Sequence, residues 1–412
     1  MTADADDLKK RALDYHALPR PGKLTVESSK PCATAAELSL AYTPGVAAPV
    51  REIHRDPAAA YQYTNKGNLV AVITDGTAVL GLGNVGALAS KPVMEGKAVL
   101  FKRFADIDVF DIEITAPSIE SFIETVVNIA PTFGGINLED IAAPHCFRIE
   151  RELRERLNIP VFHDDQHGTA VVICAALINA LYLQDKQLET AKIAFLGAGA
   201  AGMATTRLLK AMGATDITLV NKNGVLHTGR DDIDSGQRDL LRDTESRTLA
   251  DAMQDADVFI GVSAANALPA EYLSKMADKP IVFALANPDP EILPSQAAAV
   301  RPDVLMATGR SDFPNQVNNA LCFPYLFRGA LDAKAPQVSQ QMQIAAAYAL
   351  AELARESVPA EVCSAYEDIE ISFGKDYIIP KPFDPRLLSR VSNAVAEASL
   401  AEQANQPAAA NS

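Results

Sequence analysis

The segment between Lys192 and Val220 constrains the fold of this chain more than any other part of the sequence. A short apolar run, KIAFL, is followed by the glycine-rich loop GAGAAG, the helix-like stretch MATTRLLKAMG and a second apolar run, DITLV. This order is typical of a βαβ unit that binds a dinucleotide, because the backbone N–H groups at the helix N-terminus attract a pyrophosphate. A tight turn without a ligand is the alternative. We expect cofactor contacts from the loop residues, namely Gly197, Ala198, Gly199, Ala200, Ala201 and Gly202.

The same glycine spacing occurs a second time, at Gly81, Gly83 and Gly86, in a different context. The residues that follow include Pro92, which we expect to interrupt any helix that starts at Gly86. We therefore interpret this copy as a structural or substrate-side turn and not as a second nucleotide loop.

The end of the DITLV run bears on the choice of cofactor. A carboxylate at this position would bind a ribose 2′-hydroxyl and would repel a 2′-phosphate. The chain has Asn221 and Lys222 there instead. We therefore expect NADP to be preferred over NAD, with a solvated turn position for Lys222 as the alternative.

The remaining pattern of apolar runs predicts a two-domain α/β protein, which suits a length of 412 residues. Strands are expected at 69–73, 108–114, 256–262, 280–286 and 303–309, and helices at 118–129 and 169–183, the second of them buried. The predicted organisation is an N-terminal α/β substrate and metal domain (1–165), a Rossmann-type doubly wound parallel-sheet domain that binds NAD or NADP (166–390) and a flexible C-terminal tail (391–412).

Charge and composition exclude several classes of function. A net charge of −15 argues against a nucleic-acid partner. The N-terminus lacks the apolar core of a signal peptide, and no apolar run reaches the length of a membrane span. The five cysteines are scattered without a CxxC pair, so we expect no disulfide framework and a cytoplasmic location.

Two pairs of acidic residues follow apolar segments, Glu139 with Asp140 and Asp164 with Asp165. Like charges at short range raise each other's pKa, so the two pairs converge easily only around a cation. Carboxylate ligands without a nearby cysteine suit Mg²⁺ or Mn²⁺. Helix caps and solvated surface charges are the alternative reading of these acids. His163 and His167 could bind a transition metal at i, i+4, but a helix across DDQHG is doubtful.

Seven motifs taken together resemble the malic enzymes, in particular their short bacterial branch, from about residue 15 to 385. They are SLAYTPGVA, SKPVMEGKAVLFK, GGINLEDI, VFHDDQHGTA, FLGAGAAG, LANPDPE and TGRSDFPNQVNN. The resemblance implies oxidative decarboxylation of L-malate to pyruvate and CO2, with reduction of NAD or NADP and with a divalent metal. It implies decarboxylation of oxaloacetate as a further activity. It also implies at least a homodimer, in which the N-terminal segments are exchanged between the chains.

The resemblance also implies roles for individual residues. Lys97 matches the general base, Tyr42 the general acid and Asp164 the neighbour of the lysine, while the metal ligands match Glu139, Asp140 and Asp165. Substrate contacts match Lys97, Asn287 and Asn318, with Asn319 as an alternative to Asn318, and further cofactor contacts match Thr169, Asn287, Asn221 and Lys222.

The chain departs from longer relatives in having Ala78 where they carry a carboxylate-binding arginine. It also lacks the acetyltransferase-like extension of some bacterial members, so we expect no activity of that extension. A base that works near neutral pH requires the pKa of Lys97 to be depressed by burial or by cationic neighbours. The competing functions are a metal-independent amino-acid dehydrogenase and a non-catalytic protein that senses the cofactor.

Overall fold

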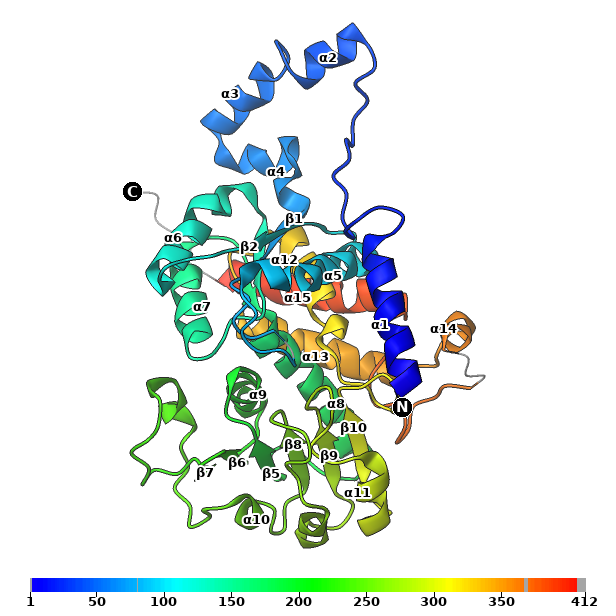
Figure 1. Cartoon of the computed structure of the whole chain (residues 1–412). Coiled ribbons are helices and arrows are strands. Elements are labelled where there is room, and N and C mark those ends of the chain that lie inside the picture. Colours follow the sequence, from blue (N-terminus) through cyan, green and yellow to red (C-terminus); the bar gives the residue numbers. More distant parts are fainter. Residues whose placement is uncertain (1, 80, 367–369, 406–412) are drawn as a thin grey trace.

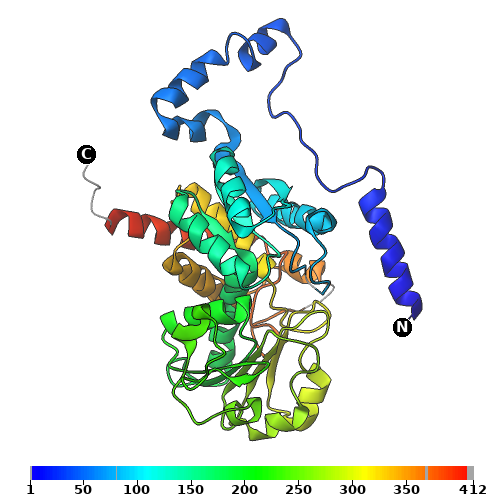
Figure 2. The ribbon, with the colours of Figure 1, turned by 60° about the vertical axis from the view of Figure 1, so that its left-hand side comes forward.

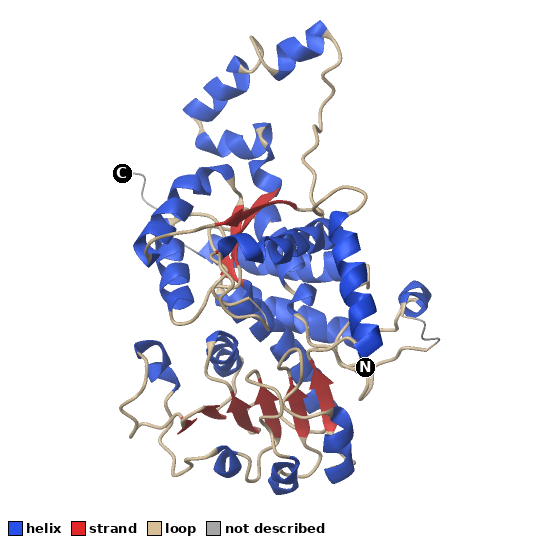
Figure 3. Ribbon diagram, in the orientation of Figure 1, coloured by secondary structure: helices blue, strands red, loops and turns tan. Residues whose placement is uncertain are grey.

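Two parallel β-sheets, each covered by helices, form the body of the protein in the computed structural model (Figure 1, Figure 3). The structure describes residues 2–79, 81–366 and 370–405. The first sheet is built from residues 69–163 and the second from residues 192–308. The predicted fold class, an α/β protein with a Rossmann-type sheet in its second half, is therefore confirmed.

The first sheet has four parallel strands in the order β2-β1-β3-β4. The strands are β1 (Leu69–Thr74), β2 (Asp108–Glu113), β3 (Gly135–Leu138) and β4 (Val161–His163). The run LVAVIT is buried along its whole length, as expected for a central parallel strand covered on both faces. The connecting helices are α5 (Ala87–Ala105), α6 (Ile119–Ile129) and α7 (His145–Arg156).

The second sheet has the order β10-β9-β8-β5-β6-β7, and β7 is antiparallel to β6. The strands are β5 (Lys192–Leu196), β6 (Asp216–Asn221), β7 (Gly224–Val225), β8 (Val258–Gly261), β9 (Ile281–Ala284) and β10 (Leu305–Thr308). The connecting helices are α9 (Ala200–Ala211), α10 (Leu249–Ala252) and α11 (Pro294–Val300). The strand order reverses beside β5, which is the position where open α/β sheets bind their ligands.

Long helices join the two sheets into one core. They are α8 (Thr169–Leu183), α12 (Phe323–Asp332), α13 (Gln340–Arg355) and α15 (Arg386–Asn405). The short helix α14 (Ala360–Ala365) lies between α13 and α15 in the sequence. Helix α12 packs on α5, where the Phe101 ring lies 4.8 Å from the Phe323 ring and 5.3 Å from the Phe327 ring. The stretch Asp164–Leu183 has the length and hydropathy of a membrane span, but 72% of its most apolar window is buried inside the fold, as in a core helix.

Two expectations about helices are wrong. Helix α5 runs through Pro92 without a break. Proline removes only the bond to the carbonyl of Leu88, and Leu88 is exposed, so water can satisfy that carbonyl. The predicted frayed tail is instead helix α15 up to Asn405, which buries Val391 and Val395 against α12 and α13. The rest of that prediction, 406–412, lies outside the described residues.

The N-terminal residues form an arm that projects from the body (Figure 2). Its helices are α1 (Thr2–Ala17), α2 (Ala35–Ala41), α3 (Ala47–Arg55) and α4 (Ala60–Tyr63). The arm touches α5 through Lys23, whose Nζ donates to the carbonyl of Pro92 at 2.6 Å and whose backbone N–H donates to Glu95 at 2.9 Å. Large apolar side chains along it are exposed, including Leu13, Leu40 and Tyr42.

Candidate active site

Lys97 lies at the centre of the candidate site, on the buried face of α5. Its Nζ lies 2.7 Å from Oδ2 of Asp164 and 2.7 Å from Oε1 of Glu139. The ring of Phe323 lies under the ammonium group, 4.4 Å from Nζ to the ring centroid. Only 9% of the Lys97 side chain is exposed, so the amine is held in a protected position by two carboxylates and an aromatic face.

Three acids converge beside this lysine. Ligand oxygens of Glu139, Asp140 and Asp165 lie within 4.8 Å of one another. Glu139 and Asp140 follow β3, where Asp140 adopts a positive φ of 53°, and the backbone N–H of Asp140 donates to Oδ2 of Asp165 at 2.9 Å. Oδ2 of Asp140 is buried without a hydrogen-bond partner. An orphaned oxygen in a cluster of hard ligands fits a divalent cation such as Mg²⁺ or Mn²⁺.

Burial is the main reason that the pKa of each of these carboxyl groups lies above its ordinary value. Burial raises the pKa to about 7 for Glu139 and Asp164, to about 8 for Asp140 and to about 6 for Asp165. Repulsion between the carboxylates adds to this effect, and the charge of Lys97 opposes it. The four groups therefore resist full ionisation at neutral pH unless a cation joins them.

The pKa of Lys97 differs from the expectation. Burial lowers this pKa, but the charges of Asp164, Glu139 and Asp165 together outweigh burial and raise it above its ordinary value. The reason is that the structure surrounds the amine with carboxylates and not with cations. A cation bound by the neighbouring acids would cancel part of this effect.

A tight π-helical turn, Asp164–Gly168, leads from β4 into α8. The backbone N–H of Thr169 donates to the carbonyl of Asp164 and closes the turn. A Cβ atom at Gly168 would lie 1.8 Å from Oδ1 of Asp164, so only glycine fits at this position. Thr169, predicted to bind the cofactor, is thus the first residue of α8, directly after the turn.

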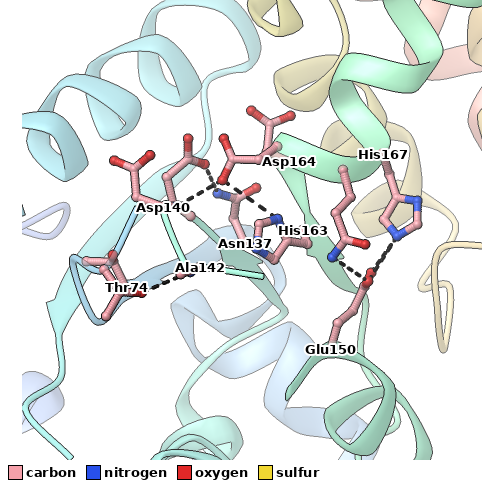
Figure 4. A network of polar contacts seen from close by, with 12 residues as sticks. Thr74, Asn137, Asp140, Ala142, Glu150, His163, Asp164 and His167 are labelled. Carbon is pink, nitrogen blue, oxygen red and sulfur yellow. Dashed lines mark hydrogen bonds and ion pairs between the residues drawn. The ribbon is translucent and has the colours of Figure 1, made fainter. Parts of the chain in front are cut away.

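The two histidines near this turn do not form the i, i+4 pair that was considered as a metal site. His163 ends β4 and is fully buried, and burial lowers its pKa to about 4. His167 points to α7, where its Nε2 lies 3.0 Å from Oε2 of Glu150 (Figure 4).

The glycine loop has the geometry that the sequence predicts. It connects β5 to α9, and Gly197 adopts a φ of 116° that L side chains rarely adopt. A Cβ at Gly202 would lie 1.7 Å from the carbonyl oxygen of Gly197, so the third glycine permits close packing of helix and strand. A Cβ at Gly199 would meet nothing, which leaves the N-terminus of α9 open for an approaching ligand.

The side chain of Arg230, which follows β7 in the sequence, reaches the end of β6, and the sequence pattern did not indicate this cation. Nη1 of Arg230 donates to Oδ1 of Asn221 at 2.9 Å, and the Arg230 side chain is only 8% exposed. Lys222, the predicted cation, is an exposed residue of the turn to β7. Asp232 binds Nε and Nη2 of Arg230 at 2.7 and 2.6 Å, so a 2′-phosphate of NADP would have to displace that carboxylate to pair with the guanidinium.

Comparison with known proteins gives the family. The family models described as "Malic enzyme, N-terminal domain" and "Malic enzyme, NAD binding domain" match residues 21–154 and 166–370. This chain belongs to the malic enzyme family. The alternatives of an amino-acid dehydrogenase and a non-catalytic sensor are thereby excluded.

Individual malic enzymes match over nearly the whole chain. The NADP-dependent malic enzyme of Halomonas elongata is 59% identical over 397 residues, which cover 96% of this chain and 94% of that protein. The NADP-dependent malic enzyme of Rhizobium meliloti is 56% identical over 392 residues, 94% of this chain, and the chain spans 52% of that longer protein. The crystal structure of the NAD-dependent malic enzyme of Thermotoga maritima superposes with a TM-score of 0.86 at 42% identity, covering 93% of this chain and 98% of the other.

Not every predicted residue lies at the Lys97 pocket of this malic enzyme. Asn318 caps the 3₁₀ helix Asn319–Leu321, which packs on the Asp164 turn, and its Oδ1 accepts from the N–H of Ala320 at 2.9 Å. Asn287 is exposed in the loop after β9, and the next residue, Pro288, lies 3.9 Å from the position of a Cβ at Gly81. The loops of the two halves therefore meet beside the site.

Tyr42 lies apart from the other predicted catalytic residues. It ends α2 in the projecting arm and is 69% exposed, and Figure 1 shows α2 far from α5. Within one chain the structure therefore does not bring Tyr42 to Lys97.

Three further contacts of the malic enzyme site escaped the sequence analysis. They are Phe323 under Lys97, Arg230 beside Asn221, and Asn137, whose Nδ2 donates to Oε2 of Glu139 at 2.9 Å. The contact of Asn137 with Glu139 could have been predicted, because Asn137 lies on β3 two residues before Glu139, which directly follows that strand. Phe323 was not, because its contact with Lys97 depends on the packing of α12 on α5.

Proposed function

We propose that this malic enzyme catalyses the oxidative decarboxylation of L-malate to pyruvate and CO2, dependent on Mg²⁺ or Mn²⁺ and with NADP as the preferred cofactor. Oxaloacetate decarboxylation is proposed as a second activity of the same site. The observation that carries the proposal is the position of Lys97, 2.7 Å from both Asp164 and Glu139 and beside a cluster of three acids.

The acid cluster supports a resident metal. Glu139, Asp140 and Asp165 would hold the ion, and the orphaned oxygen of Asp140 would gain a partner. When bound, the metal supplies positive charge that stabilises a developing enolate, and the nicotinamide accepts the hydride from malate.

Lys97 is placed to take up the proton of the malate hydroxyl. Asp164 and Glu139 fix its amine, and Phe323 excludes water from one side. The amine accepts a proton only in its neutral form, so partial neutralisation of the surrounding acids favours its role as a base. Asn287 and Asn318 would orient the substrate carboxylate without adding charge.

A proton must return to C3 after CO2 has left, and we propose that the phenol of Tyr42 from a second copy supplies it. Tyr42 is exposed on an arm whose apolar side chains lack cover within the described chain. A homodimer that exchanges arms would cover those side chains and complete each site. Exchange of an element between identical chains is a common route to dimers.

The cofactor preference and the location follow from separate observations. We propose NADP over NAD because the similar enzymes of Halomonas elongata and Rhizobium meliloti are NADP-dependent, and because Arg230 would offer a 2′-phosphate a guanidinium beside Asn221 once the phosphate displaces Asp232. All five cysteines are unpaired, which is usual in a reducing cytoplasm. We propose a cytoplasmic enzyme whose partners are malate, pyruvate and its own second copy, with no nucleic acid and no membrane.

Initial rates test this function. We expect pyruvate and NADPH to form in equal amounts from malate with Mn²⁺, to stop with a chelator and to return when Mn²⁺ is restored. The variant Lys97→Ala should retain its fold and lose malate oxidation, because no proton acceptor remains. Malate oxidation that a chelator leaves unchanged, or that yields no pyruvate, would refute the proposal.

A further inference from the structure

A buried carboxylate outside the proposed catalytic set joins α7 to the turn that carries two of the predicted acids. Glu150 lies on α7 with 6% of its surface exposed. Its Oε2 accepts hydrogen bonds from Nε2 of Gln166 at 3.2 Å and Nε2 of His167 at 3.0 Å. Figure 4 shows Glu150 below the turn, on the opposite side from the Asp164 carboxylate.

The two partners of Glu150 directly follow the functional acids in sequence. Asp164 and Asp165 use one side of the π-helical turn to contact Lys97 and the backbone N–H of Asp140. Gln166 and His167 use the other side to reach α7. A shift of this turn would therefore move Asp164 and Asp165 together.

A buried carboxylate is retained at this position at an energetic disadvantage unless its oxygens have partners. Oε2 has both of its partners on the turn, and Oε1 lies 2.8 Å from Nε2 of the same His167 without a hydrogen bond of good geometry. Among the described residues, the carboxylate is therefore fixed by the turn alone, and it holds the turn in return. Loss of a residue that hydrogen-bonds a metal ligand directly weakens metal binding by about 10–100-fold in metalloproteins. Glu150 acts one step further out, through the turn that carries Asp164 and Asp165, so we expect an effect at the lower end of that range.

We propose that Glu150 is a positioning residue for the metal site: it anchors Gln166 and His167 so that Asp165 meets Glu139 and Asp140 in a ligating arrangement. This inference rests on the proposed metal-dependent function. Helix α7 then has two functions: it covers the first sheet, and through Glu150 it positions the turn that carries Asp165.

The test measures Mn²⁺ binding by isothermal titration calorimetry, without malate or cofactor. The variants are Glu150→Leu, which removes both acceptor oxygens, and Glu150→Gln, which keeps an acceptor and the side-chain length. The matched control is Glu155→Leu, the same change on the same helix at an exposed residue without a partner among the described contacts. Melting temperatures of the metal-free proteins show whether each variant is folded.

We expect the Mn²⁺ dissociation constant of Glu150→Leu to rise by about tenfold or more, and Glu150→Gln and Glu155→Leu to stay within about threefold of the parent. An unchanged constant in folded Glu150→Leu would overturn the inference. If Glu150→Leu does not fold, His167→Leu is measured in its place, because it removes one of the two hydrogen bonds to Glu150. An unchanged Mn²⁺ dissociation constant in His167→Leu would equally overturn the inference.

A variant of a proposed ligand separates failure of this inference from failure of the proposed function. If Asp165→Asn weakens Mn²⁺ binding and Glu150→Leu does not, the metal site stands and only the role of Glu150 falls. If Asp165→Asn leaves Mn²⁺ binding unchanged, the proposed metal site itself is wrong.

Discussion

Replacing Asp164 with asparagine should move the pH dependence of malate oxidation to lower pH. The substitution keeps an oxygen near Nζ of Lys97, 2.7 Å from the present Oδ2, and removes one negative charge. At that separation and an effective dielectric constant of about 20, the direct charge interaction is about 6 kcal/mol. This energy corresponds to about four pH units and is an upper bound, because burial raises the pKa of Asp164 to about 7 and its carboxyl group is only partly ionised near neutral pH. We therefore expect the pKa of Lys97 to fall by about 1–3 pH units, the usual range for loss of an adjacent opposite charge.

The assay is kcat/KM for malate from about pH 6 to about pH 11 at saturating Mn²⁺ and NADP, because the pKa of Lys97 in the parent lies above the ordinary lysine value of about 10.4 unless the bound ion lowers it. The base works when neutral, so a lower pKa moves the rising limb of the profile to lower pH. Asp384→Asn is the matched control, because Asp384 is also buried and its Oδ2 lies 2.7 Å from Nη2 of Arg386, outside the pocket. A limb that stays in place, or moves to higher pH, would refute the assignment of Lys97 as the base.

Three further results are expected. Mn²⁺ should bind more tightly as the pH rises from about 6 to about 8, because Asp165, Glu139 and Asp140 have pKa values of about 6, 7 and 8 and must lose their protons to bind the ion. Titration calorimetry measures the affinity across this range, and an affinity that does not change with pH would contradict the prediction. Arg230→Ala should raise the KM for NADP by about tenfold and the KM for NAD much less, and equal effects on both cofactors would remove Arg230 from recognition of the 2′-phosphate. The inactive variants Lys97→Ala and Tyr42→Phe, unfolded and refolded together in equal amounts, should regain about a quarter of the parent rate of pyruvate formation. About half of the dimers are then mixed, and one of the two sites in each mixed dimer has both Lys97 and Tyr42. If no activity returns, Tyr42 acts in the site of its own chain or in no site.

The fold could be predicted where local pattern and packing agree. The runs LVAVIT and KIAFL are short, apolar and bounded by turn residues, and both are central strands of parallel sheets. The prediction failed at Pro92, because proline excludes one hydrogen bond from a helix but does not exclude the helix. It failed also at the C-terminus, where Leu387, Val391 and Val395 recur every four residues in a stretch otherwise rich in alanine and serine.

The sequence predicted which residues form the site but not how their side chains are arranged in space. The acids that follow β3 and β4 were predicted to surround a cation, with helix caps and surface charges as the alternative, and their ligand oxygens do converge. The pKa of Lys97 could not be predicted, because it depends on how many carboxylates pack around the amine. The position of Tyr42 could not be predicted either, since sequence spacing does not show whether an arm folds back on its own body.

Mn²⁺ binding to Asp165→Asn, followed by electron paramagnetic resonance, tests the central claim most directly. The account predicts one tightly bound ion per parent chain and an affinity at least about tenfold weaker in the variant, with malate oxidation lost at the Mn²⁺ concentration that saturates the parent. One equally tight ion in the folded variant, or full malate oxidation without any bound ion, would contradict it.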